Sequence, residues 1–155
     1  MAKNTLKDSF EQCIKEASIS ALNSLVADMK RRIHQEGKKT DGSQIGDYNK
    51  NFVLPENSYP DYLPGEKYVA YRKRKGRQVG YIDLQLYKNL SDSFQVGQDG
   101  NRFFAGFDSA EQYEIAQKHT DHYGQIWKPS EDEKQYCREE FGKIYRQCLN
   151  QLFKR

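Results

Sequence analysis

Two histidines, an aspartate and a cysteine in the last third of the chain have side chains that could hold a metal ion. His119 and His122 flank Asp121, and Cys137 follows fifteen positions after His122. A structural zinc site needs a second paired motif, and a common catalytic zinc site has the pattern His-Glu-x-x-His. The sequence contains neither. We interpret the histidines as part of a surface turn and expect no metal or cofactor.

The other reactive side chains also lack the spacing of a catalytic site. The cysteines fall on apolar helical stripes, whereas a nucleophilic thiol has to be exposed and activated. The stretch from Gly97 to Gly100 is better explained as a hairpin turn than as a phosphate-binding loop. Carboxylate pairs such as Glu139–Glu140 lie on a predicted helix surface. We therefore expect a binding or structural protein and no enzyme.

Composition favours a single folded domain over residues 1–155. The chain is 36% hydrophobic and 30% charged, with a net charge of +3, and its 11 tyrosines and 8 phenylalanines supply core material. The modest apolar content also fits a subunit that completes its burial against copies of itself. There is no apolar run of membrane-spanning length and no signal-peptide core, so we expect a cytoplasmic origin and no membrane contact.

The three cysteines are expected to be reduced core thiols, because their number is odd and small. Cys137 and Cys148 are eleven positions apart on one predicted helix, about 16 Å along its axis, so they cannot bridge each other. Cys13 lies on the first predicted helix.

Apolar periodicity predicts long helices at both ends of the chain. The first covers residues 5–36, with apolar residues every three or four positions from Leu6 and a cap at Gly37. The C-terminal part, 109–154, is predicted to hold a short helix, Ala110 to Lys118, which the residues from His119 to Gly124 break. A final helix follows, with Ser130 and Glu133 forming a capping box.

Residues 68–108 between these helices are predicted to be rich in β-structure. Ser93 to Val96 alternates polar and apolar residues, Asp99-Gly100 is a turn dipeptide, and Arg102 to Phe107 is the expected return strand. An apolar cluster precedes this hairpin and consists of Leu84, Leu86, Tyr87 and Leu90. The fold class is therefore α+β: a long N-terminal helix, a central antiparallel sheet with a hairpin, and a short helix and a C-terminal helix packed on the sheet.

Residues 38–67 are predicted to form a long loop, because turn formers and helix breakers occur throughout. Aromatic residues in such a loop must pack on something, either the parent domain or a groove of a neighbouring subunit. The candidate subunit-contact residues are Tyr48, Phe52, Tyr59 and Tyr62.

Five of the six residues from Arg72 to Arg77 are basic. This run is typical of a solvated hairpin or edge strand, of a phosphate-binding patch, or of a localisation or heparin-like signal. Ion pairs with the acidic loop before it, within or between subunits, explain it equally well. The residues expected to face DNA or an acidic partner are Arg72, Lys73, Arg74, Lys75 and Arg77.

The order of short motifs resembles the virion morphogenesis and tail-completion proteins of tailed bacteriophages and prophages. After the long helix and its Asp41-Gly42 loop come Tyr68-x-x-Tyr71-Arg72 and a basic glycine-containing turn. The later motifs are Asp83-Leu84-x-Leu86-x-x-x-Leu90-x-x-Ser93-Phe94-x-Val96-Gly97, then Ala116 near His119, Tyr123-Gly124 and Trp127-Lys128-Pro129. Tyr87-Lys88 and Trp127-Lys128-Pro129 depart from the residues common in that family.

The resemblance implies a non-enzymatic structural protein of the neck or tail junction, found in the virion and assembled in the cytoplasm of a bacterial host. It also implies a ring of identical subunits between the head connector, or portal, and the tail tube, with possible transient contact with DNA. The alternative is a small nucleic-acid-binding protein that uses the basic run together with Tyr68, Tyr71 and Tyr81. An enzyme whose site forms only between subunits is a third possibility.

Overall fold

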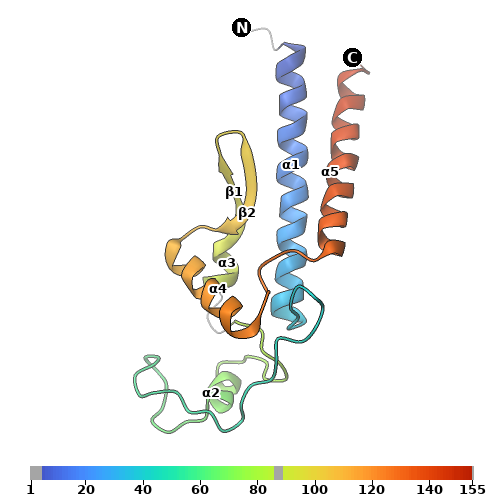
Figure 1. The fold of residues 1–155 in the computed structure, drawn as a ribbon. Helices are drawn as coiled ribbons and strands as arrows, with labels where there is room; N and C mark the ends of the chain where they lie inside the picture. Colours follow the sequence, from blue (N-terminus) through green and yellow to red (C-terminus); the bar gives the residue numbers. More distant parts are fainter. Residues whose placement is uncertain (1–4, 86–88, 155) are drawn as a thin grey trace.

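The computed structural model describes residues 5–85 and 89–154 and has the predicted α+β class. Two long helices form an arm at one end of the molecule, and a β-hairpin lies beside the arm. The loops on either side of residues 68–74 form a loop lobe at the other end (Figure 1). In chain order the elements are α1 (Leu6–Lys30), the π-helix η1 (Arg31–Gln35), α2 (Tyr68–Arg74), α3 (Asn89–Ser93), β1 (Phe94–Asp99), β2 (Arg102–Phe107), α4 (Ala110–Tyr123) and α5 (Glu131–Leu152).

Helix α1 forms where the apolar periodicity predicts it. Thr5 and Asp8 make a capping box at its start, and the residues from Cys13 to Met29 that recur along one stripe are buried. The last turn widens into η1 rather than continuing as α-helix. Gly37 follows with a φ of 65°, a conformation that suits glycine at a helix end.

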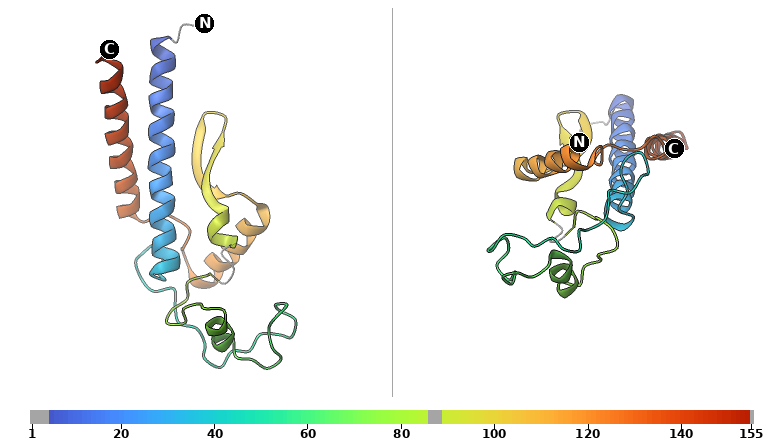
Figure 2. Two further views of the ribbon diagram at one scale, coloured as in Figure 1. Left: turned by 180° about the vertical axis from the view of Figure 1, so that it is seen from behind. Right: turned by 60° about the horizontal axis from the view of Figure 1, so that its bottom comes forward.

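Helices α1 and α5 run antiparallel side by side and together form the arm (Figure 2). Ser130 and Glu133 make the predicted capping box at the start of α5. The prediction of three reduced cysteines is wrong for two of them, because Cys13 and Cys148 form a disulfide across the arm. The antiparallel packing brings their Cα atoms to 5.6 Å, within the range of a disulfide, and leaves Cys137 as a free thiol.

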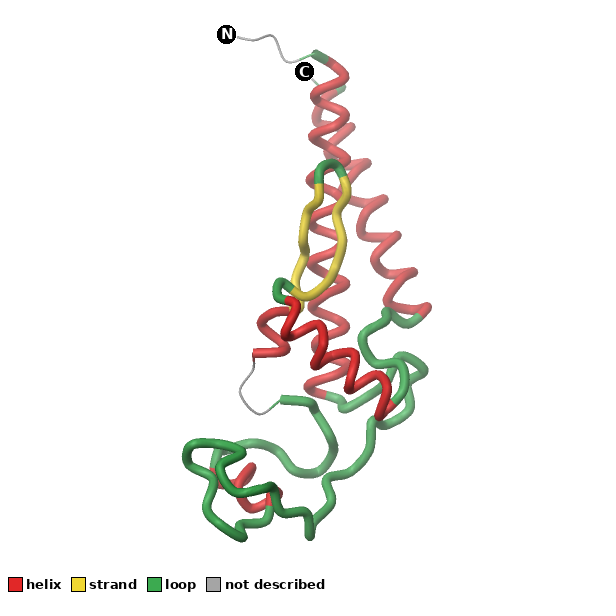
Figure 3. Tube along the Cα trace, turned by 60° about the vertical axis from the view of Figure 1, so that its left-hand side comes forward, coloured by secondary structure: helices red, strands yellow, loops and turns green. Residues whose placement is uncertain are grey.

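The predicted hairpin is confirmed as an antiparallel pair of strands, β1 and β2. The two turn residues are Gly100 and Asn101, one position later than predicted, because Asp99 still pairs with Arg102. Phe104 on the outer face is exposed, and the opposite face lies against α1 (Figure 3).

The prediction of β-structure from residue 68 is wrong in its first part, since Tyr68–Arg74 forms helix α2. The first strand begins only at Phe94. The loop 38–67 contains two isolated β-bridges, Lys38 with Gln44 and Val53 with Lys67, and no strand. Of the predicted apolar cluster, Leu90 is buried, and Leu86 and Tyr87 lie outside the described residues.

Helix α4 is longer than predicted. Ser109 caps it as expected by accepting a hydrogen bond from Gln112 N. It continues through both histidines to Tyr123 and ends at Gly124, whose φ is 90°. The predicted end at Lys118 is therefore wrong, and of the residues from His119 to Gly124 that were expected to break the helix, Gly124 is the one that ends it.

Two clusters of buried apolar residues join the elements to one another. The first joins α1 to the hairpin through Leu25, Val26, Met29 and Phe94. The second joins η1 to the loops through Ile33, Ile45, Ile82 and Ile126. Trp127 packs against both clusters, so the connector before α5 links the arm to the loop lobe. No helix among the described residues is long and apolar enough to cross a membrane.

Candidate interaction sites

The aromatic residues of the long loop pack on helix α2 of the same chain. Tyr59 stacks on Tyr71 with ring centroids 5.5 Å apart, and Tyr62 meets the same ring edge-on at 5.1 Å. Tyr62 is buried, so it cannot contact a neighbouring subunit. Of the two packing partners that the sequence left open, the parent domain takes these side chains.

The second pair of loop aromatics packs on the first turn of α2. The Tyr48 and Phe52 rings approach Tyr68 edge-on, with centroids at 5.8 and 6.3 Å. Phe52 remains exposed over nearly half of its surface. These contacts explain why residues 68–74 become a helix: Tyr68 and Tyr71 lie three positions apart on one helical face, and the loop covers that face.

Acidic residues of the loop pair with part of the basic run, as one sequence interpretation expected. Arg74 donates to Glu66 at 2.8 Å and lies 3.5 Å from Asp61, and Lys75 pairs with Asp61 as well. The hydrogen bond from Arg74 lowers the pKa of Glu66. The pairing lies within one chain.

Arg72, predicted to face DNA or an acidic partner, is instead only 1% exposed. Its Nη2 donates to Asp83 Oδ1 and Oδ2 at 2.8 and 3.0 Å, and its guanidinium lies 4.4 Å from the Tyr48 ring centre. The Tyr48 hydroxyl donates to Asp83 at 2.8 Å. Burial, with Asp83 beside it, raises the pKa of Tyr48 well above its ordinary value. Arg72 therefore anchors α2 to the segment around Asp83, a role that the sequence alone did not reveal.

The same segment is tied to the end of the long helix through His34. Its ring Nδ1 lies 2.7 Å from the Asp83 carbonyl oxygen, which can only accept, so Nδ1 is the protonated nitrogen. The other nitrogen, Nε2, is buried without a hydrogen-bond partner. Burial lowers the pKa of His34.

A second buried arginine joins the end of the long helix to the start of the last one. Arg32 Nε donates to Glu133 Oε1 at 2.8 Å, across 101 positions of the chain. Its other nitrogens donate to the backbone carbonyl groups of Lys38, Ile126 and Lys128. Because Glu133 also caps α5, this one carboxylate fixes both the start of α5 and its position on η1.

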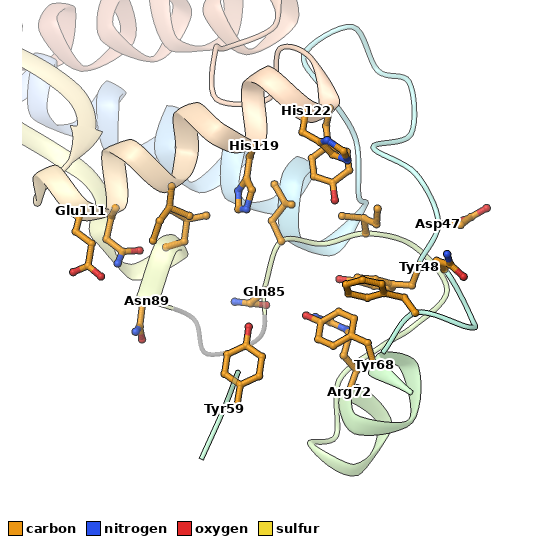
Figure 4. A pocket seen from close by; sticks show the side chains of 18 residues that line it. Asp47, Tyr48, Tyr59, Tyr68, Arg72, Gln85, Asn89, Glu111, His119 and His122 are labelled. Carbon is orange, nitrogen blue, oxygen red and sulfur yellow. The ribbon is translucent and has the colours of Figure 1, made fainter. Parts of the chain in front are cut away.

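A groove of about 680 Å³ lies between the loop lobe and helix α4. Figure 4 shows His119 on α4 pointing down toward Gln85 and Tyr59 on the facing side. The groove is lined by Asp47, Tyr48, Asn49, Phe52, Tyr59, Tyr68, Arg72, Ile82, Leu84, Gln85, Asn89, Leu90, Glu111, Gln112, Ile115, His119, His122 and Tyr123.

Both histidines that the sequence singled out line this groove. His119 Nδ1 is buried without a hydrogen-bond partner, and burial, followed by repulsion from His34 and His122, lowers the pKa of His119. Within the described ranges, no three His, Cys, Asp or Glu side chains gather as a metal site would require. The geometry is that of an aromatic and polar binding surface with a carboxylate at each end, Asp47 and Glu111.

The arm offers a second surface, which is apolar. Leu6, Ile14 and Phe153 are 62%, 45% and 69% exposed. Among the residues of α5, only Glu133 is buried, so the apolar stripe of that helix is covered only in part by α1. A hollow of about 420 Å³ lies between the arm and the hairpin tip, and Phe103, Cys137 and Phe141 are among the residues that line it.

Comparison of the chain with protein-family models, with curated proteins and with solved structures finds no match.

Proposed function

We propose that this chain is a non-enzymatic structural protein of the phage or prophage neck, a tail-completion protein that acts by assembling with copies of itself. One observation supports the proposal most directly: the arm leaves the apolar stripes of two long helices partly uncovered. Patches of this kind on a folded chain are typical of interfaces.

A helix pair standing alone can bury only the seam between its two members. Each helix here carries an apolar stripe, and residues such as Ile14 lie outside the seam and remain exposed. In the views of Figures 1 and 2, the upper ends of α1 and α5 extend past the hairpin tip and lie beside each other. A neighbouring subunit that packs along the arm would cover these residues. Each Å² of apolar surface removed from water would stabilise the assembly by about 25 cal/mol.

The order of motifs along the chain supports the specific role. The head connector, or portal, and the tail tube are then the partners, the virion is the final location, and assembly takes place in the host cytoplasm. The basic run gives limited support to contact with DNA. Arg72 is buried, and Arg74 and Lys75 are paired, which leaves Lys73 exposed and Arg77 half-buried. These two side chains are what remains for the alternative function, nucleic-acid binding.

The test measures self-assembly by native mass spectrometry and by imaging of particles assembled with the portal. We expect rings of the chain, and we expect the double substitution of Ile14→Glu with Phe153→Glu to weaken association roughly 100-fold, because two apolar side chains lose their burial. Leu63→Glu is the matched control, since Leu63 is equally exposed but lies in the loop lobe. A chain that stays monomeric and never enters particles contradicts the proposal.

A further inference from the structure

The charges of the groove are unbalanced. Asp47 and Glu111 line it at opposite ends of the close-up view, and neither has an ion-pair partner within residues 5–85 and 89–154 (Figure 4). Arg72 is the one arginine or lysine among the described lining residues, and its charge is already matched by Asp83. Among the described residues these two carboxylates have no ion-pair partner, so they favour a cationic group in the groove.

Five of the eighteen residues that line the groove are phenylalanine or tyrosine. Tyr48 and Tyr68 stand on the loop-lobe side (Figure 4), and Tyr123 is the last residue of α4. The lobe already holds one cation in this way, because the Arg72 guanidinium lies 4.4 Å from the Tyr48 ring centre and 5.9 Å from that of Tyr68. Aromatic faces attract a lysine or arginine head group through the ring quadrupole, and more strongly where water is excluded.

Neutral amide side chains complete the lining. Gln85 comes from the segment after Asp83, Asn89 from the start of α3, and Gln112 from the first turn of α4. An amide offers both a donor and an acceptor, which matches the N–H and C=O groups of an extended peptide. The buried Nδ1 of His119 adds one more polar atom without a partner.

We propose that this groove binds an extended segment of a partner protein that carries arginine or lysine. The carboxylates take the cationic side chains, the tyrosine rings take their stems and head groups, and the amides take the peptide backbone. The volume lies within the 300–1,000 Å³ common for ligand sites. Phosphate-bearing ligands are disfavoured, because Asp47 and Glu111 repel them. This site is separate from the arm and does not depend on self-assembly.

The experiment titrates the ¹⁵N-labelled chain with acetyl-GRGRG-amide and follows backbone amide shifts. We expect saturable shifts around residues 47–52, 82–85 and 111–123, with binding that weakens as salt rises. Acetyl-GEGEG-amide and acetyl-GQGQG-amide are the control peptides, and neither should produce these shifts. Equal binding of the glutamate peptide, or no shift with millimolar arginine peptide, overturns the proposal.

Variants locate the binding. Glu111→Gln and Asp47→Asn remove exposed charges and should each weaken binding of the arginine peptide roughly tenfold, as expected for loss of a charge-assisted contact. Glu114→Gln, on the same helix but outside the groove, should leave the affinity unchanged. If Glu111→Gln instead reduces self-association, the occupant is a second copy of the chain and the assignment to a partner protein is overturned. Rings that form normally without peptide binding overturn this proposal alone.

Discussion

At the base of the molecule, two buried arginines tie together segments that are far apart in the sequence, whereas along the arm two helices meet through partly covered apolar stripes. Arg32 joins η1 to α5 and Arg72 joins α2 to Asp83, each with a nearly inaccessible carboxylate. The arm instead has the Cys13–Cys148 disulfide and apolar residues that face solvent.

The difference shows how a chain of modest apolar content can order a loop of about thirty residues. Its aromatic rings pack on α2, and its Tyr48 hydroxyl donates to Asp83, the carboxylate that is paired with the buried Arg72. Such pairs specify one arrangement because a misplaced partner leaves a buried charge unmatched. The arm has fewer such directional contacts and leaves apolar side chains exposed.

The largest effect is expected at the base. Arg72→Met should lower the free energy of unfolding by about 3–5 kcal/mol, because Asp83 is left as a buried charge without its partner. Chemical denaturation monitored by tyrosine and tryptophan fluorescence measures the change. Arg74→Met is the control for this prediction. Arg74 is exposed and its ion pairs are screened by water, so the free energy of unfolding of this variant should be close to that of the parent chain. A loss below about 1 kcal/mol for Arg72→Met would contradict the buried-pair interpretation.

A smaller loss is expected in the arm when its covalent link is removed. The double substitution of Cys13→Ser with Cys148→Ser should cost about 2–4 kcal/mol under oxidising conditions, because the unfolded chain regains the freedom that the cross-link removes. Cys137→Ser serves as the control, because Cys137 is a free, half-buried thiol. Equal stability of the parent and the double variant, measured without reductant, would show that the link does not stabilise the arm.

The smallest effect is expected from pH. His34 and His119 both have a lowered pKa in the folded chain, mainly because of burial. The unfolded chain therefore takes up protons first, and the free energy of unfolding should fall as pH decreases from about 6.5. Thermal melts at pH 7.5 and pH 5.5 measure the difference. The double substitution of His34→Gln with His119→Gln should flatten this dependence, and an unchanged slope would rule out these two histidines as its source.

Sequence patterns predicted the parts of the fold that depend on local chemistry. The long first helix, the caps at Ser109 and Ser130, and the presence of the hairpin all follow from residues within a few positions of one another, whereas the register of the hairpin differs from the prediction because its turn is Gly100-Asn101. Phe103 and Phe104 face opposite sides of the hairpin as alternation requires. These features do not depend on distant contacts, so a local pattern is sufficient.

The interaction sites could not be predicted in the same way, because distant residues create them. In the sequence alone, the basic run beside Tyr68 and Tyr71 is typical of an edge strand. The segment becomes helix α2 because aromatic residues of the loop cover one of its faces. No neighbouring residue in the sequence indicates that Arg72 is buried. Arg32 contacts Glu133 because the two long helices pack antiparallel. The signal for the disulfide was present, since Cys13 and Cys148 both occupy apolar stripes, but pairing them requires the relative register of α1 and α5.

The Cys13–Cys148 link also closes residues 13–148 into a covalent circle. A protease that cuts once within the exposed loop 38–67 would then release no fragment in an oxidising medium. The two pieces would migrate together in a gel and separate only after a reductant is added. A subunit nicked in this way keeps both pieces attached to the arm.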